Sequence, residues 1–127
     1  MIERLIRISS VAFLLFLLAF YATAQQTDGQ VDLSQFNFEE KGPANLSGKW
    51  EFYWNRLLSP EDFLTPQKPA WIHPSSWHRQ GEYAVLGFAT YRIKLKVPEN
   101  QWGLSLYFPI INSSSKIWIN GELASET

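Results

Sequence analysis

The sequence predicts an all-β domain, an antiparallel β-sandwich or jelly roll, and three observations support this fold class. Apolar and polar side chains alternate strictly through residues 89–97, which is the period of a strand with one buried face. Aromatic residues, which favour strands, make up 16% of the chain. Several short apolar stretches are separated by turn residues, and Asn120-Gly121 is a type I′ hairpin signal between two of them.

Composition excludes several classes of protein. A net charge of −1 and 46% apolar residues are typical of one globular domain. The chain has no basic run interleaved with aromatic residues, and nucleic-acid binding is therefore excluded. It has no cysteine, which removes disulfides, cysteine zinc sites and thiol catalysis.

Residues 1–24 are predicted to be a signal peptide. Two arginines precede an unbroken apolar run over residues 11–22, and Ala22-Thr23-Ala24 follows the small-x-small pattern of a cleavage site. The apolar run has 12 residues, fewer than the about 20 that cross a bilayer, which favours cleavage. An uncleaved anchor that begins near Ile8 is the alternative. We expect export to the periplasmic or extracellular side of the bacterial cytoplasmic membrane.

The first part of the mature chain is predicted to be extended. Residues 25–30 are polar with one glycine and are typical of a linker. Residues 31–38 alternate as an edge strand with a bulge, and Lys41-Gly42-Pro43 ends it. Residues 50–54 are predicted to form a strand, because three aromatic side chains share one of its faces: Trp50, Phe52 and Trp54.

The middle of the chain is predicted to contain a short helix and a loop. Ser59-Pro60-Glu61-Asp62 is a helix start, with serine as the N-cap, proline at the first helical position and acids in the first turn. Two prolines that follow closely keep the helix short. Residues 71–77 are predicted to be extended, because a residue before proline avoids the helical region, and residues 78–86 form a loop.

Residues 89–97 are predicted to form one continuous strand. Its buried face consists of Ala89, Tyr91, Ile93, Leu95 and Val97. Its wet, cationic face consists of Thr90, Arg92, Lys94 and Lys96. This strand is expected to organise the core.

The C-terminal part is predicted to add a strand and a hairpin. Residues 103–108 form a strand that buries its alternate apolar side chains, Leu104, Leu106 and Phe108. Residues 116–119 form a strand that leads into Asn120-Gly121, and a returning strand begins in residues 122–127. A sandwich needs further strands to cover that edge, so we expect the chain to be the N-terminal piece of a longer protein.

Five motifs occur in a fixed order along the chain. They are Leu46-Ser47-Gly48-Lys49-Trp50-Glu51-Phe52-Tyr53-Trp54, Leu57-Leu58-Ser59-Pro60-Glu61-Asp62-Phe63, Pro74-Ser75-Ser76-Trp77, Gly87-Phe88-Ala89-Thr90-Tyr91-Arg92 and Ile117-Trp118-Ile119-Asn120-Gly121. Together they resemble the extracellular sensor domain of bacterial seven-transmembrane receptors with diverse intracellular signalling modules. The resemblance implies that residues 31–127 are a galactose-binding-like jelly roll, truncated at the C-terminus.

The resemblance also implies a function, a non-catalytic ligand-binding sensor of a membrane signal-transduction receptor. In such receptors seven membrane helices follow the sensor, and the cytoplasmic output is a histidine kinase, a nucleotide cyclase or a diguanylate cyclase. The resemblance implies attachment to the membrane through a missing C-terminal region. The implied partner is a small-molecule ligand such as a saccharide.

Two other functions stay open. The N-terminal sugar-binding domain of beta-galactosidase or beta-glucuronidase type glycoside hydrolases shares the Gly-x-Trp start, the Pro-x-x-Trp motif, the Tyr-Arg strand and the Asn-Gly hairpin. The Trp-Glu-Phe-Tyr-Trp run and the Pro-Glu-Asp-Phe helix favour the receptor over the glycoside hydrolase. The third hypothesis is a free-standing exported binding module.

No motif predicts catalysis, a metal or a cofactor. Glu61 and Asp62 are adjacent acids in a first helical turn, where they usually complement the helix dipole. His73 and His78 are only two soft ligands, too few for a zinc site. Ser75-Ser76 lacks the glycine elbow of a hydrolase nucleophile. The chain itself is therefore not expected to be an enzyme.

The predicted ligand site consists of Trp77, His78, Arg79, Tyr83 and Arg92. An aromatic platform with hydrogen-bond donors suits a sugar or a carboxylated ligand. The competing interpretation, which general burial preferences favour, is that Trp77 packs on the core and Arg79 is solvated. For Arg92 the competing interpretation is an ion pair across the sheet with Glu51.

Overall fold

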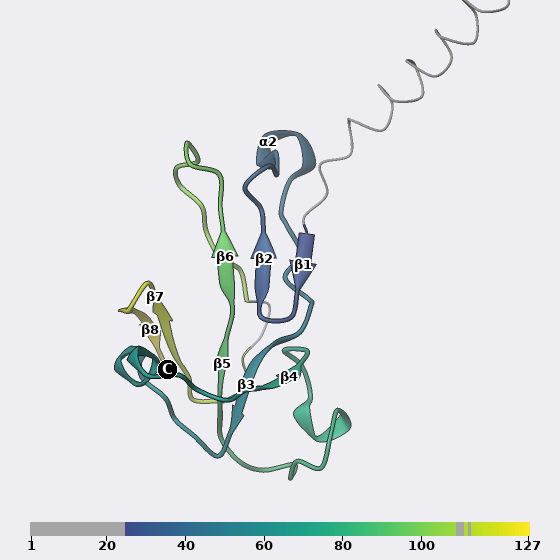
Figure 1. Ribbon diagram of the computed structural model, residues 1–127, viewed down its shortest axis with the longest axis vertical. Coiled ribbons are helices and arrows are strands. Elements are labelled where there is room, and N and C mark those ends of the chain that lie inside the picture. The colour runs from purple at the N-terminus through teal and green to yellow at the C-terminus, as the bar shows by residue number, and fades with distance from the viewer. Residues whose placement is uncertain (1–24, 109–110, 112) are drawn as a thin grey trace, which may run out of the picture.

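The computed structural model describes residues 25–108, 111 and 113–127. Over these residues it contains eight short strands and one short α-helix, with two 3-10 helices in the connections (Figure 1). The all-β class predicted from the sequence is therefore confirmed. The predicted signal peptide, residues 1–24, lies outside the described residues.

The strands form three small sheets. The first has the order β1-β2-β6, with β1 Gln25–Thr27, β2 Gln30–Asp32 and β6 Lys94–Lys96. The second has the order β4-β3-β5, with β4 Ala70–Ile72, β3 Trp50–Trp54 and β5 Ala89–Arg92. The third is a hairpin of β7 Lys116–Ile119 and β8 Glu122–Glu126. Pairing is antiparallel as predicted except between β2 and β6, which are parallel.

Residues 25–30, predicted to be a linker, instead form most of a β-hairpin. β1 pairs with β2, and Gly29 in the turn has a φ of 73°. Its N–H donates to the Lys49 carbonyl at 2.8 Å, and its own carbonyl accepts from the Lys94 N–H at 2.9 Å. A Cβ on Gly29 would lie 2.4 Å from the Trp71 ring, so only glycine fits where the two sheets join.

The predicted edge strand over residues 31–38 is found only at its start, because β2 ends at Asp32, residues 33–37 are neither strand nor helix, and the short helix α2 Phe38–Lys41 begins at its last residue. Asn37 caps the helix, because its side-chain oxygen accepts from the Glu40 N–H at 3.1 Å. Gly42, with a φ of 71°, ends it. Local capping therefore outweighs the alternation of the apolar side chains in this segment.

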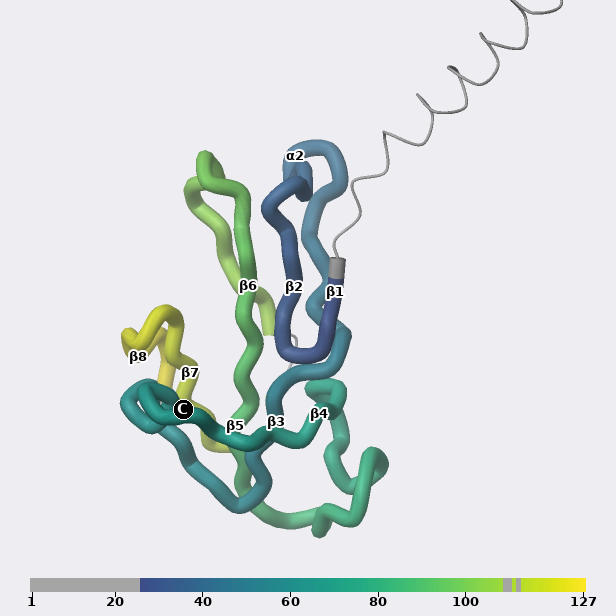
Figure 2. Tube along the Cα trace, in the orientation of Figure 1, coloured from purple at the N-terminus to yellow at the C-terminus, as the bar shows by residue number. Residues whose placement is uncertain are grey.

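Residues 89–97 form two strands and not the predicted single one. Ladder pairing stops at Ile93, since β5 pairs with β3 while β6 pairs with β2. Figure 2 shows the same run of chain passing from one sheet to the other. The predicted cationic face is uneven, because Arg92 is half-buried whereas the lysines of β6 are exposed. Val97 is 41% exposed and not buried as predicted. It lies just outside β6, which ends at Lys96 because its partner strand β2 ends at Asp32.

β3 lies between β4 and β5 and carries the centre of the core. The predicted strand over residues 50–54 is confirmed. Glu51, Phe52 and Tyr53 are all buried, so both faces of β3 are covered. The buried apolar residues are Val31, Leu33, Phe52, Tyr53, Leu58 and Ile72.

The predicted helix start is confirmed as the 3-10 helix η1 Pro60–Leu64. The backbone N–H of Ser59 donates to Asp62 Oδ2 at 2.8 Å, which is the bond that the third helical residue makes in a capping box, and the Ser59 hydroxyl donates to the same oxygen at 3.0 Å. The segment 71–77 is extended only at its start in β4, because the 3-10 helix η2 Trp77–Arg79 begins at its end.

Residues 103–108, predicted to be a buried strand, form none. No neighbouring strand among the described residues offers them backbone partners, and Leu104, Leu106 and Phe108 are 40–43% exposed. The predicted hairpin is confirmed. Asn120 and Gly121 have φ values of 52° and 86°, both positive as a type I′ turn requires.

Candidate functional site

The predicted ligand residues lie on opposite faces of the sheet formed by β3 and β5. In the register of these strands Phe52 opposes Tyr91, and Glu51 opposes Arg92. Successive side chains of a strand point to opposite faces. Trp77, whose ring contacts Phe52, therefore lies on the face away from Arg92. The structure does not bring Arg92 together with the other predicted residues.

One face of β3 is covered by the aromatic cluster, which consists of Phe52, Trp54, Trp77, Tyr83 and Tyr91. The Trp77 and Trp54 ring centroids are 5.4 Å apart, and the Trp77 indole N–H donates to the Ala84 carbonyl at 2.8 Å. Tyr83 and Tyr91 each lie 5.0 Å from Phe52. Burial, and then the nearby Tyr83, raises the pKa of Tyr91 to about 12. Trp77 thus packs on the core, as the competing interpretation states, and the half-buried Tyr83 packs beside it against Phe52 and Trp54.

His78 and Arg79 follow Trp77 in η2 and are exposed. Solvation of Arg79 again agrees with the competing interpretation. Two polar side chains at the surface beside a packed indole offer donors but no open aromatic platform. A ligand-binding role for Trp77, His78, Arg79 and Tyr83 stays a prediction.

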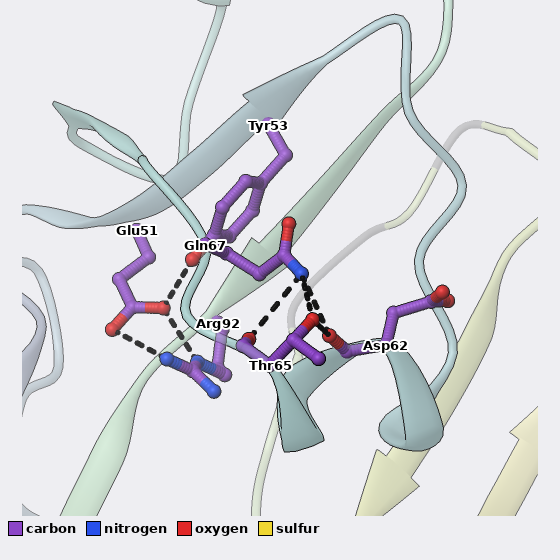
Figure 3. Close-up of polar contacts among 6 residues, drawn as sticks. All are labelled: Glu51, Tyr53, Asp62, Thr65, Gln67 and Arg92. Atoms are coloured by element: carbon purple, nitrogen blue, oxygen red, sulfur yellow. Dashed lines mark hydrogen bonds and ion pairs between the residues drawn. The ribbon is translucent and has the colours of Figure 1, made fainter.

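The other face of β3 carries the Glu51 network, which consists of Glu51, Tyr53 and Arg92 (Figure 3). The Arg92 guanidinium donates through Nε to Glu51 Oε2 and through Nη2 to Oε1, the latter at 3.0 Å. The Tyr53 hydroxyl donates to Glu51 Oε2 at 2.7 Å. The Arg92 guanidinium also stacks 4.1 Å from the centroid of the Phe63 ring. The predicted ion pair across the sheet is confirmed, and it is bidentate.

The charges of Glu51 and Arg92 neutralise each other within this network, and the pKa values of its members reflect that pairing. Burial alone would raise the pKa of Glu51, but hydrogen bonds from Arg92 and Tyr53 outweigh it and lower that pKa. Burial, and then the bond to Glu51, raises the pKa of Tyr53 to about 12. The hydrogen bond to Glu51 raises the pKa of Arg92. Because both charges are paired, the network stabilises the sheet and presents no free charge to a substrate.

The carboxylates of η1 serve the helix and its loop. Asp62 Oδ2 accepts both Ser59 bonds, and these bonds lower the pKa of Asp62. Gln67 Nε2 donates to the Asp62 carbonyl at 2.7 Å and to the Thr65 carbonyl at 3.3 Å, which ties the loop back onto the helix (Figure 3). Asp62 therefore acts as a capping residue.

The two histidines do not meet in the structure. His73 Nδ1 lies 2.7 Å from the Ser47 carbonyl oxygen, while His78 is exposed in η2. Within residues 25–108, 111 and 113–127, no three His, Cys, Asp or Glu side chains gather where they could hold a metal ion. A search of the same residues finds no helix with the length and apolar character to span a membrane.

An open hollow of about 400 Å³ is lined by residues that follow β2 and by residues at and after the end of β6. It is lined by Ser34, Gln35, Lys96, Val97, Pro98, Glu99 and Asn100. Because β2 and β6 are parallel, the residues that follow each strand emerge at the same edge of the sheet (Figure 1). Sequence reasoning missed this hollow, because alternation does not predict that two strands so far apart in the chain pair in parallel.

The chain was compared with protein families, curated proteins and solved structures. None of the three comparisons finds a match. Function is therefore inferred from the motifs and the geometry.

Proposed function

We propose that residues 31–127 are the extracytoplasmic ligand-sensing domain of a membrane signal-transduction receptor. The domain is non-catalytic and of the galactose-binding-like jelly-roll type, and residues 1–24 direct its export. It binds a small molecule, while membrane attachment and the signalling output belong to a longer parent protein.

The observation that carries this proposal is the meeting of four of the five motifs around β3. The Phe52 ring of the first motif lies 6.4 Å from Trp77 of the third and 5.0 Å from Tyr91 of the fourth. These rings belong to segments far apart in sequence, so their contact agrees with a motif set that encodes one packed unit.

The second motif joins the same unit from the opposite face of β3. The Phe63 ring lies 5.5 Å from Tyr53 of the first motif. The Leu58 N–H donates to Thr90 Oγ1 of the fourth motif at 2.9 Å. The fifth motif forms β7 and the turn that follows it. The motifs are thus packing determinants, which supports the use of their order to infer a family.

A non-catalytic role is supported by how the polar groups are used. Among the described residues, no buried side-chain nitrogen or oxygen lacks a hydrogen-bond partner. Catalytic groups commonly have perturbed pKa values and lie in a cleft where they can reach a substrate. Here the pKa of Glu51 is lowered, yet its carboxylate is hydrogen-bonded to Arg92 and Tyr53.

Reading the coding frame beyond Thr127 tests the proposal. We expect seven apolar spans followed by a cytoplasmic signalling module. A long soluble region with a barrel pattern and acidic catalytic residues would instead support the glycoside hydrolase alternative. A stop codon directly after Thr127 would support the free-standing module, and either result contradicts the receptor.

Export is tested separately by fusing alkaline phosphatase, which is active only outside the cytoplasm, to the C-terminus of the chain. We expect phosphatase activity in cells that carry the whole chain and none when residues 1–24 are deleted. Equal activity in both fusions would contradict the signal peptide.

A further inference from the structure

Two hairpin turns of the chain share a chemical feature, an Asn or Asp residue followed by glycine. Asn120-Gly121 joins β7 to β8, and Asp28-Gly29 joins β1 to β2. In such a pair the backbone nitrogen of the glycine can attack the side-chain carbonyl carbon of the preceding residue, because glycine has no Cβ to shield that nitrogen. The sequence makes both turns candidates for this reaction, and the structure separates them.

The turn at Asn120 leaves both reacting groups open. Asn120 and Gly121 are exposed, and a Cβ on Gly121 would meet no atom within 4 Å. Within residues 25–108, 111 and 113–127, neither the Gly121 N–H nor the Asn120 side chain makes a hydrogen bond. No hydrogen bond of these two groups therefore has to break before they react.

The hairpin around Asn120 is expected to open at little cost in free energy. Among the described strands β8 pairs only with β7, and all five of its residues are exposed. Trp118 and Leu123, which are register partners in this hairpin, stay 38% and 52% exposed. A segment with so few covering contacts opens by local fluctuation. The Asn120 side chain can then reach the Gly121 nitrogen.

The turn at Asp28 is closed to the same reaction. Gly29 is buried, and its N–H already donates to the Lys49 carbonyl at 2.8 Å. The Gly29 carbonyl accepts from the Lys94 N–H at 2.9 Å, and the Trp71 ring covers the position that a Cβ would take. Freeing this nitrogen requires both hydrogen bonds to break and the indole to withdraw, which is a larger and costlier opening.

We propose that Asn120 is a site of spontaneous deamidation and that the fold protects the matching turn at Asp28. The Gly121 nitrogen gives up its proton to a solvent base and bonds to Asn120 Cγ. The Cγ–Nδ2 bond then breaks, and the leaving nitrogen takes a proton from water and departs as ammonia. A second step adds water to either carbonyl of the cyclic imide and yields aspartate or isoaspartate. The net reaction consumes water and releases ammonia.

Either product is expected to change the hairpin. Both add a carboxylate close to Glu122, the first residue of β8, and like charges so close repel each other. Isoaspartate also inserts its Cβ into the main chain, so a two-residue turn with positive φ at both residues no longer fits. We expect β8 to lose its register with β7. This modification goes beyond the proposed sensing function and does not depend on it.

The exported chain and its Asp28→Asn variant are incubated for several weeks at mildly alkaline pH. Peptide mass mapping and labelling by an isoaspartyl methyltransferase measure the reaction at each position. The variant is the matched control, because it places the same Asn-Gly pair in the protected turn. In the folded variant we expect Asn120 to react at least about tenfold faster than position 28. In concentrated urea we expect similar rates at the two positions, because only the fold distinguishes them.

Two further measurements separate the reaction from folding defects. Thermal unfolding of Asp28→Asn is expected to match the parent, because Asp28 is exposed. Asn55 has a similar φ of 54° but precedes Arg56 and not glycine, and it is expected to remain intact in the parent chain. The deamidated protein, separated by anion exchange, is expected to lose hydrogen-exchange protection in β7 and β8.

Three outcomes overturn the inference. The first is an Asn120 that stays intact in the folded chain. The second is an equal rate at Asn120 and at position 28 in the folded Asp28→Asn variant, since the fold would then give no protection. The third is unchanged hydrogen-exchange protection after deamidation, which contradicts the loss of register. None of these outcomes bears on the proposed sensing function, which the reading frame beyond Thr127 tests.

Discussion

The two faces of β3 are stabilised by different kinds of interaction. On one face, aromatic rings surround Phe52. On the other face, Glu51 accepts hydrogen bonds from Tyr53 and Arg92. Contacts between apolar side chains scale with buried area and need no partner of fixed direction, whereas a polar network fails when one member is left unmatched. The aromatic face should therefore respond to lost volume, and the polar face to lost partners and to pH.

Phe52→Ala is expected to have the largest effect. The side chain is 1% exposed and contacts four other rings, so the substitution should lower the free energy of unfolding by about 3–5 kcal/mol. Urea unfolding followed by circular dichroism measures it. Leu86→Ala, at a side chain that is 88% exposed, is the control and should change stability by less than about 0.5 kcal/mol. A loss below about 1 kcal/mol in Phe52→Ala would show that this face is not the core.

Glu51→Ala is expected to have the next largest effect, because it leaves the guanidinium of Arg92 half-buried and unpaired. The loss should be about 2 kcal/mol, the scale of charge-assisted hydrogen bonds. A double-mutant cycle with Arg92→Ala measures the coupling, which we expect to be about 1–2 kcal/mol. Additive losses would mean that the ion pair contributes nothing measurable, as many exposed pairs do.

Acid should destabilise the polar face selectively. The folded-state pKa of Glu51 lies below its ordinary value of 4.5, so the stabilisation is complete above that value and is lost as the pH falls through the folded pKa. Urea midpoints measured between pH 7 and pH 3 should fall less in Glu51→Gln than in the parent. Some acid dependence should remain, because the pKa values of Asp32, Glu61 and Asp62 are also lowered. Identical slopes in the two proteins would contradict the role of Glu51.

Replacing one tyrosine by phenylalanine on each face of β3 is expected to have the smallest effects and compares the two faces directly. Tyr53→Phe removes the 2.7 Å bond to Glu51 and should lower the free energy of unfolding by about 1 kcal/mol. Tyr91→Phe removes only a 3.4 Å contact to the Ser75 carbonyl and should cost less than about 0.5 kcal/mol. Chemical denaturation measures the free energy of unfolding of both variants. Equal losses in the two variants would contradict the proposed difference between the faces.

The elements that were predicted correctly are those set by local signals. The strand over residues 50–54, the capped start of η1 and the Asn120-Gly121 turn each depend on neighbours within a few residues. Tertiary pairing was not predictable in this way. The split of residues 89–97 reflects two different partner strands, β3 and β2, and period-two alternation carries no information about partners.

In the candidate sites, too, features set by local sequence were predictable and features set by tertiary pairing were not. The ion pair of Arg92 with Glu51 and the packing of Trp77 were both anticipated as competing interpretations, because strand alternation and burial preferences are local arguments. The hollow was not anticipated, since it exists only where β2 and β6 end side by side. Exposure of Trp102 at 88% likewise depends on which parts of the chain cover it, and sequence alone does not predict that.

The parallel pairing of β2 with β6 also bears on the order of folding. Asp32 and Lys96, which form an ion pair across these strands, are 64 residues apart in the chain. Contacts of such large sequence separation form slowly, because a long loop must close before they contribute. In a chain synthesised from its N-terminus, β2 therefore waits with one open edge until β6 has emerged. The first sheet to begin is expected to be completed after the hairpin of β3 and β4.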